Sequence, residues 1–494
     1  MMPEMPSHEG EAAFPEKSLD QPEPVLRIDS LTLKNYRCFS ECAVSFHPQL
    51  TVLVAENAQG KTAILNGIGM ALDVFVSAIT SGDTAAGFEL DSVHLVRGER
   101  SAMVPSTPTQ FRAEGFVNGV NVQWGRELAN YSPKARTSTK DTRSVQLHTE
   151  QLRLKASANS EKSDATGGFL PVVAYFKTDR VWGGKREAVK GGKKYLSHPG
   201  RFAAYADCLS PSSSFNEFSL WYGDAFNALR NPSSKIRGPE DRLEGHLAAI
   251  HESVRVVLEP TGWATIDWEF PNKESGGLSG DGFIVVEHPV RGRFPLSLLS
   301  DGVKNMVALV ADLAYRCVRL NPHLGEDSPK YTPGVVLIDE VDLHLHPGWQ
   351  QRVVGLLQKA FPALQIICTT HSPQVLSTVD AKSIRLIQLD DGKANLCQPK
   401  YQTRGVESAD ILARLMNVDP VPFVDEAHWL SDYRAMVQTQ MHDSTSGCQL
   451  WEKITKHFGA DHPVLAEIET LRRLQEFRKS NTALFTLAES NAKD

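Results

Sequence analysis

The alternation of apolar and polar residues predicts strands near the beginning of the chain. Residues 26–49 alternate as antiparallel strands do, and the apolar run from Leu50 to Val54 is typical of a strand buried on both faces. From Thr62 onward the apolar side chains recur at helical spacing, in TAILNGIGMALDVFV. The segment AENAQGKT therefore joins a predicted buried strand to a predicted helix.

The middle of the chain has less regular patterns. Asn118 and Gly119 stand between two alternating runs and predict a hairpin turn. Residues 132–168 are polar and predict a flexible insert, and FLPVVAYFKTD then predicts another buried strand. Residues 181–201 carry lysines and arginines among glycines, a pattern that fits either a solvated loop or a loop that contacts phosphates.

Helices and buried strands follow one another in the second half. LSLLSDGVKNMVALVADLAYRCVRL predicts a turn that opens a long amphipathic helix, GVVLIDE predicts a buried strand, and LQIICTTHSP predicts a further buried strand with a polar end. After about residue 400 the pattern is mostly helical.

These patterns predict three regions of different character. We expect a disordered tail over residues 1–24, an α/β head over residues 25–400, and a helical domain over residues 401–494 that serves assembly or partner docking. Within the head, an insert and a helical lobe are expected over about residues 98–290.

The composition argues against several classes of protein. Hydrophobic residues make up 41% of the 494 residues, as in ordinary globular proteins, and no apolar run is long enough for a membrane span, so we expect a cytoplasmic protein without membrane contact. The net charge of −7 does not indicate a chain coated with nucleic-acid contacts. Seven scattered cysteines without a C-x-x-C pair argue against a disulfide framework or a structural zinc site.

Residues 55–62 nearly match a phosphate-binding loop, G-x-x-x-x-G-K-[ST], but Ala55 replaces the first glycine. Gly60 offers a backbone that can wrap a phosphate, Lys61 an ammonium for the β- and γ-phosphates, and Thr62 a hydroxyl for Mg²⁺. Alone, the segment fits a nucleotide site or a chance match, and Ala55 is tolerable if its φ is negative. The predicted ATP contacts are Asn57, Ala58, Gln59, Gly60, Lys61 and Thr62.

The strand GVVLIDE ends in two carboxylates, Asp339 and Glu340. Asp339 could hold Mg²⁺ through water, with Thr62 as the other metal-site residue, and Glu340 could polarise the water that attacks the γ-phosphate. Many core strands also end in an acid without any catalytic role, so this segment alone leaves both interpretations open.

Two further segments carry possible phosphate contacts. Ser300 and Gly302 at the start of a helix could form a second anion site from a hydroxyl, backbone N–H groups and the helix dipole, although Ser300 or Asp301 could equally be an ordinary N-cap. His371 at the end of LQIICTTH could hydrogen-bond the γ-phosphate, or it could be purely structural.

The order of these segments resembles the ATP-binding-cassette (ABC) ATPase head of the SMC, RecF and OLD-like group. The interval from Lys61 to Asp339 is too long for a compact AAA+ or RecA module. The resemblance implies ATP and Mg²⁺ as ligands, Ser300 and Gly302 contacting the γ-phosphate in trans, and therefore a homodimer whose two heads are bridged by ATP.

The segment VDLHLHP after Glu340 resembles the D-loop of that family, which implies that Asp342 lies at the interface between two heads. His344 and His346 are separated by one residue, a spacing that two metal ligands can have, but no third ligand is evident.

The segments LPVVAYFKTDRVW and YADCLSPSSSFNEFSLWY, with the tail from TRGVESADILARL onward, resemble the PtuA ATPase of Septu and retron-linked antiphage systems. The resemblance implies a separate PtuB-like HNH nuclease as partner and a role on DNA through the complex. Residues after His371 contain no D-x-D and no strand–helix alternation to present one, and no H-N-H constellation is found, so we expect no nuclease site in this chain.

Two functions of different classes remain open at this point. In one, the chain is an ATPase, whose activity could be slow or regulatory, that assembles as an oligomer and regulates or scaffolds a nuclease. In the other, it is a RecF-like ATPase that clamps on DNA for repair. A structural assembly protein with a vestigial site is a third possibility.

Overall fold

The computed structural model describes residues 24–80, 87–98, 102–132, 136–158, 168–178, 200–210, 215–230, 243–270 and 282–491, with side chains up to residue 478. The contacts between residues divide the chain into two units, residues 1–411 and residues 412–494. The predicted tail and most of the basic segment 181–201 lie outside the described residues.

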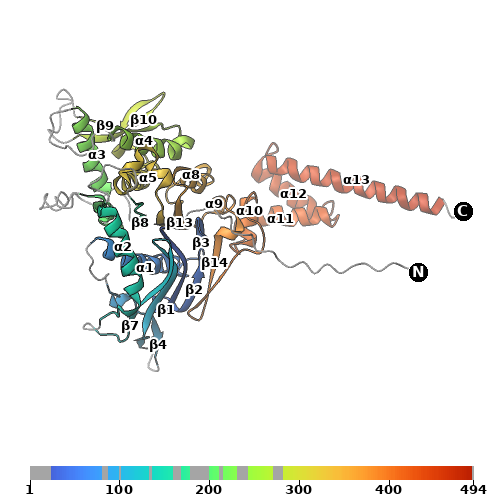
Figure 1. Ribbon diagram of the computed structural model, residues 1–494. Helices are drawn as coiled ribbons and strands as arrows, with labels where there is room; N and C mark the ends of the chain where they lie inside the picture. Colours follow the sequence, from blue (N-terminus) through green and yellow to red (C-terminus); the bar gives the residue numbers. More distant parts are fainter. Residues whose placement is uncertain are drawn as a thin grey trace, which may run out of the picture. The chain divides into compact units, whose positions relative to one another are not determined.

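The first unit is built on a ten-stranded sheet (Figure 1). Its strands, in spatial order, are β7 (Val120–Leu128), β6 (Thr109–Val117), β1 (Leu26–Tyr36), β2 (Phe39–Ser45), β15 (Lys393–Cys397), β14 (Ile384–Asp390), β3 (Leu50–Val54), β13 (Leu364–Thr369), β12 (Gly334–Ile338) and β8 (Val172–Phe176).

The burial of each strand follows from its place in this sheet. β3, β12 and β13 run parallel to one another, and all their residues are buried, which agrees with their continuous apolar sequences. β1, β2, β6 and β7 pair antiparallel, and their residues alternate between buried and exposed positions over most of their lengths. The carboxyl ends of β3, β12 and β13 therefore meet at one edge of the sheet, where ligands of α/β proteins commonly bind.

Helices of the first unit pack against the sheet or form a lobe with a small three-stranded sheet. The helices are α1 (Lys61–Thr80), α2 (Arg143–Ala158), α3 (Phe215–Arg230), α4 (Leu243–Leu258), α5 (Asp301–Leu320), α6 (Ser328–Tyr331), α7 (Pro347–Gln350), α8 (Val353–Ala360) and α9 (Pro373–Leu376), and the boundary between the two units falls within α10 (Ser408–Arg414). The small sheet contains β9 (Thr265–Glu269), β10 (Phe283–His288) and β11 (Gly292–Pro295), and β4 (Leu95–Arg97) pairs with β5 (Met103–Pro105).

Short 3₁₀ helices connect several of these elements. They are η1 (Leu90–Ser92), η2 (Lys140–Thr142), η3 (Arg201–Tyr205), η5 (Glu259–Thr261), η7 (Leu296–Leu298), η8 (Pro322–Asp327) and η9 (Ala381–Ser383). Figure 1 shows α3, α4 and α5 grouped with β9 and β10, while α1 lies beside the large sheet.

α1 is a core helix despite its apolar sequence. Among the described helices it is the one long and apolar enough to cross a membrane by length and composition, but 67% of its most apolar stretch is buried inside the fold. Its first residue, Lys61, follows the loop after β3, so the helix is anchored to the central strands of the sheet.

The second unit has a small core of its own. It contains α11 (Asp425–Gln438), α12 (Thr445–Phe458) and α13 (Pro463–Asn491), in agreement with the predicted helical character of this region. Its buried core residues are Tyr433, Val437, Ile454, Leu465 and Ile468.

The structure corrects two sequence expectations within the predicted insert. Residues 143–158 of the segment expected to be flexible form α2, which packs against α1 and β7 because Val145, Leu152 and Ala156 recur at helical spacing and are buried. β6 and β7 belong to the large sheet and not to a separate lobe over residues 98–290. The hairpin turn predicted at Asn118-Gly119 is confirmed, with positive φ at both residues, as a type I′ turn requires.

Candidate functional site

The loop between β3 and α1 tolerates Ala55 and has positive φ at two later residues. Ala55 does not take a positive φ, so the missing first glycine is tolerated there. Ala58 takes φ +63° and Gly60 takes φ +89°. A left-handed conformation costs a non-glycine residue about 1 kcal/mol, so the loop carries its strain at Ala58.

Lys61 lies over this loop and is almost buried. Its Nζ donates hydrogen bonds to the carbonyls of Ala55 (2.9 Å) and Glu56 (3.0 Å). Burial lowers the pKa of Lys61, while the charges of Asp339 and Glu340 act in the opposite direction. The ammonium is therefore within electrostatic reach of these carboxylates, and phosphate oxygens could replace the two carbonyls as its hydrogen-bond acceptors.

Asp339 joins the loop to the neighbouring strands. Its side chain is buried between two hydroxyl groups: Thr62 Oγ1 donates to Oδ2 at 2.9 Å, and Thr369 Oγ1 donates to Oδ1 at 2.6 Å. A carboxylate and a threonine hydroxyl are the hard oxygen ligands that Mg²⁺ prefers. The pair predicted from the sequence to form the metal site is thus brought together.

The donor set suits a metal that takes most of its ligands from phosphate and water. Among the residues that the structure describes, no group of three or more His, Cys, Asp or Glu side chains could hold a metal ion by itself. Mg²⁺ is commonly bound by one or two carboxylates together with substrate phosphates, and Thr62 and Asp339 fit this mode.

Glu340 follows at the end of β12 in an unusual backbone conformation. Its φ is +49°, and its N–H donates to Thr369 Oγ1 at 2.7 Å. The next residue, Val341, donates its N–H to the carbonyl of Thr369 at 3.0 Å. Two bonds to one residue of β13 therefore hold the peptide units on either side of Glu340.

His371 lies near the same charges at the end of β13. Burial lowers the pKa of His371, and the positive charge of Lys61 lowers it further, against the opposing effect of Asp342, Glu340 and Asp339. The imidazole is therefore biased toward its neutral form, which carries one N–H that can donate to a phosphate oxygen. Lys61, Thr62, Asp339, Glu340, Asp342 and His371 thus form one cluster.

The remaining loop residues lie near the surface. Asn57 and Ala58 are exposed, and Gln59 donates a hydrogen bond from Nε2 to Glu56 Oε2 at 3.3 Å.

Ser300 and Gly302 lie elsewhere, at the N-terminus of α5. Ser300 is the N-cap residue, but its exposed hydroxyl makes no capping bond. A Cβ on Gly302 would lie 2.5 Å from the carbonyl oxygen of His344, so this position requires the close approach that glycine allows. The N-terminus of α5 is thereby packed directly against the segment that follows Glu340.

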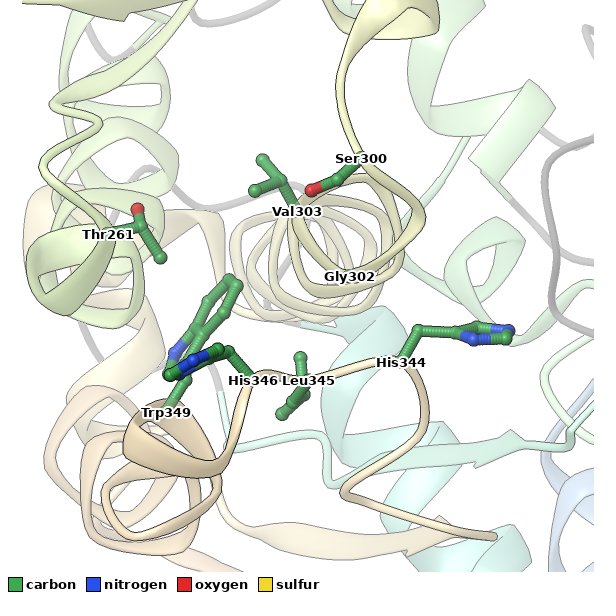
Figure 2. Close-up of a pocket in the computed structure, with 8 residues that line it drawn as sticks. All are labelled: Thr261, Ser300, Gly302, Val303, His344, Leu345, His346 and Trp349. Carbon is green, nitrogen blue, oxygen red and sulfur yellow. The ribbon is translucent and has the colours of Figure 1, made fainter. Parts of the chain in front are cut away.

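A hollow of about 610 Å³ opens beside Ser300, and residues 55–62 do not contribute to its lining (Figure 2). Its lining residues are Thr261, Ser300, Gly302, Val303, His344, Leu345, His346 and Trp349. Figure 2 shows that His344 and His346 point in different directions, and His346 Nδ1 accepts a hydrogen bond from the N–H of Gly348 at 3.2 Å. The two histidines therefore do not converge on a common metal position.

Sequence reasoning missed two contributions to the surroundings of the loop. Phe39 and Cys38 face Gly60 so closely that a Cβ there would collide with both side chains. Thr369 contacts both Asp339 and Glu340, although only the following histidine was singled out from the sequence. Neither contribution has a local sequence signal, because each depends on two segments that are far apart in the chain.

Two protein-family models match the chain in the regions that supply this cluster. One, described as "AAA domain, putative AbiEii toxin, Type IV TA system", matches residues 213–377, which include Ser300, Asp339 and His371. The other, described as "AAA domain", matches residues 30–231, which include the loop 55–62.

Comparison with known proteins gives a relative that matches most of the chain. A retron Vc95 probable ATPase of Vibrio cholerae serotype O1 biovar El Tor is 25% identical over 483 residues, covering 88% of this chain and 88% of that protein. The chain is similar to retron ATPases over most of its length and to PtuA over shorter segments. A Septu protein PtuA of Bacillus mycoides (strain KBAB4) is 35% identical over 115 residues, which are 23% of this chain and 15% of PtuA.

A solved structure is similar to this chain at low sequence identity. The crystal structure of the SmcHead bound to the C-winged helix domain of ScpA aligns with a TM-score of 0.43 and 15% identity, and the alignment covers 75% of this chain and 96% of that chain.

Proposed function

We propose that this chain is the ATP-binding and ATP-hydrolysing subunit of a cytoplasmic antiphage defence complex. In this proposal it assembles as an oligomer and regulates or scaffolds a separate HNH nuclease that acts on DNA. The observation that carries the ATPase part is the hydrogen-bonded chain from Thr62 through Asp339 to Thr369, with Lys61 beside it. The match to a retron ATPase over most of both chains supports the defence part.

The residues of the cluster suit hydrolysis of a phosphoanhydride. Glu340 would accept a proton from the water whose oxygen attacks the γ-phosphorus, as the bond from that phosphorus to the departing ADP oxygen breaks. Lys61 would bind the β- and γ-phosphates, and the N–H of His371 would contact the γ-phosphate. Mg²⁺ held near Thr62 and Asp339 would neutralise phosphate charge.

The position of Ser300 supports a site shared between two copies of the chain. Ser300 is exposed, its hydroxyl makes no capping bond, and the hollow beside it has no lining residue from the loop that carries Lys61. In the proposed homodimer, Ser300 and the N–H groups near Gly302 of one copy complete the phosphate site of the other copy, where the N-terminus of α5 favours negative charge.

We expect the Ser300→Arg variant to bind ATP with unchanged affinity and to hydrolyse it at least about tenfold more slowly, because the lost donor acts on the transition state in another copy. Steady-state turnover and the ATP dissociation constant measure the two effects separately. Ser157→Arg, at an exposed position of α2, is a matched control that adds the same side chain and should behave like the parent. An equal loss of ATP binding in Ser300→Arg would contradict the shared site.

The defence part of the proposal is tested by co-purification of the protein with the product of the neighbouring gene, followed by mass measurement and a DNA cleavage assay. We expect a stable complex that cuts DNA, whereas the isolated chain does not. Tight ATP-dependent binding of the isolated chain to gapped DNA, without a nuclease partner, would instead support the RecF-like alternative.

A further inference from the structure

The two threonines before His371 hold the acidic segment after β12. Thr369 is fully buried at the end of β13, and its hydroxyl donates to Asp339 Oδ1 at 2.6 Å while it accepts the N–H of Glu340 at 2.7 Å. Thr370 is also fully buried, and its hydroxyl donates to Asp342 Oδ1 at 2.6 Å while it accepts the N–H of Ser372 at 3.0 Å.

The hydroxyl of Thr369 donates one hydrogen bond and accepts another. A threonine hydroxyl has one proton to donate and lone pairs to accept with. The proton goes to the carboxylate of Asp339, so the lone pairs remain for the N–H of Glu340. Valine has the same shape but would leave both the carboxylate oxygen and the N–H without this partner.

The backbone of Glu340 makes this support necessary. A left-handed conformation is unfavourable for a glutamate and persists only where neighbouring contacts hold it. Here the hydroxyl of Thr369 binds the N–H of Glu340, and the carbonyl of Thr369 accepts the N–H of Val341. The direction in which the Glu340 side chain leaves the backbone is therefore set by Thr369.

We propose that Thr369 is a positioning residue for ATP hydrolysis, which fixes Asp339 and Glu340 relative to each other and joins them to the end of β13, two residues before His371. This inference rests on the proposed ATPase function. Thr370 binds Asp342 through its hydroxyl, so the segment before His371 contacts both the water-activating residue and the predicted interface loop.

The test compares Thr369→Val with Thr369→Ser in the full-length protein. We expect Thr369→Val to lower the turnover number at least about tenfold, the effect of losing a hydrogen bond to a charged group, while the ATP dissociation constant changes less than about threefold. Thr369→Ser keeps the hydroxyl and should retain at least about half of the parent turnover. A purely structural role would not produce this separation of turnover from binding, nor the rescue by serine.

Thr51→Val is a matched control in the same sheet. Thr51 is fully buried on β3, and its hydroxyl accepts the N–H of His47 at 2.8 Å, away from the carboxylates. We expect this variant to lose one buried hydrogen bond and to keep its turnover within about twofold of the parent, because the reacting groups are unaffected. Thermal unfolding of each variant shows whether it is folded. If Thr369→Val does not fold, Thr369→Ala, which leaves space for a water molecule, should show the same separation of turnover from binding.

The outcomes separate this inference from the proposed function. If Lys61→Ala loses ATP binding but Thr369→Val hydrolyses ATP at the parent rate, the ATPase function stands and the role of Thr369 is overturned. A loss of turnover in Thr369→Ser as large as in Thr369→Val would also overturn it. If the parent and Lys61→Ala bind ATP equally, the proposed function fails and this inference fails with it.

Discussion

Replacing Lys61 with alanine is expected to abolish ATP binding. The Lys61 ammonium lies over the loop between β3 and α1 and already makes two hydrogen bonds to backbone carbonyls there. When ATP binds, the same N–H groups can donate to phosphate oxygens instead of these carbonyls. Each charge-assisted hydrogen bond contributes roughly 1.5–3 kcal/mol. Losing two of them raises the dissociation constant about 100-fold or more, which titration calorimetry with Mg-ATP would measure.

A matched variant separates this effect from the loss of a positive charge in general. Lys34 is exposed on β1, so Lys34→Ala removes the same ammonium from a position without contacts to the loop and should bind ATP like the parent. The assignment of the loop is wrong if Lys61→Ala binds ATP as tightly as Lys34→Ala.

Replacing Glu340 with glutamine is expected to stop hydrolysis and preserve binding. Glutamine has nearly the same size as glutamate. The left-handed backbone at position 340 is equally unfavourable for both residues, so the fold around β12 should not change. The amide cannot accept the proton of the attacking water, and the loss of a general base lowers turnover by about 10²–10⁴-fold. Phosphate release under saturating ATP measures the loss.

The same variant should accumulate the ATP-bridged dimer, because the bound ATP is not consumed. Glu407→Gln removes a carboxylate from an exposed position and serves as the control, with parent turnover expected. Hydrolysis by Glu340→Gln at the rate of the Glu407→Gln control would exclude Glu340 as the base.

The nucleotide-binding part of the fold could be predicted from the sequence because its signals are local. The apolar run before residue 55 and the apolar spacing after Thr62 specify a buried strand followed by a helix, and the structure has both. GVVLIDE and LQIICTTH similarly encode parallel strands with polar ends. Because the carboxyl ends of such strands meet at one edge, the proximity of Lys61, Asp339 and His371 could be anticipated.

Contacts between distant segments could not be predicted in the same way. β1 pairs with β6, and β2 pairs with β15, but the sequence of each strand does not indicate which other strand it pairs with. α2 was missed because its few buried side chains stand among many polar ones, so its apolar face is narrow. The left-handed conformation of Ala58 could not be predicted either, because φ depends on the whole path of the loop.

A mixing experiment tests the central claim, that each ATP site is shared between two copies, most directly. Lys61→Ala chains retain Ser300 but cannot hold ATP, and Ser300→Arg chains retain Lys61 but cannot complete a partner's site. In an equal mixture, half of the dimers pair one chain of each kind and contain one intact site, so turnover should reach about a quarter of the parent value while each variant alone is nearly inactive. Turnover of the mixture no higher than the mean of the two variants measured separately would contradict the shared site.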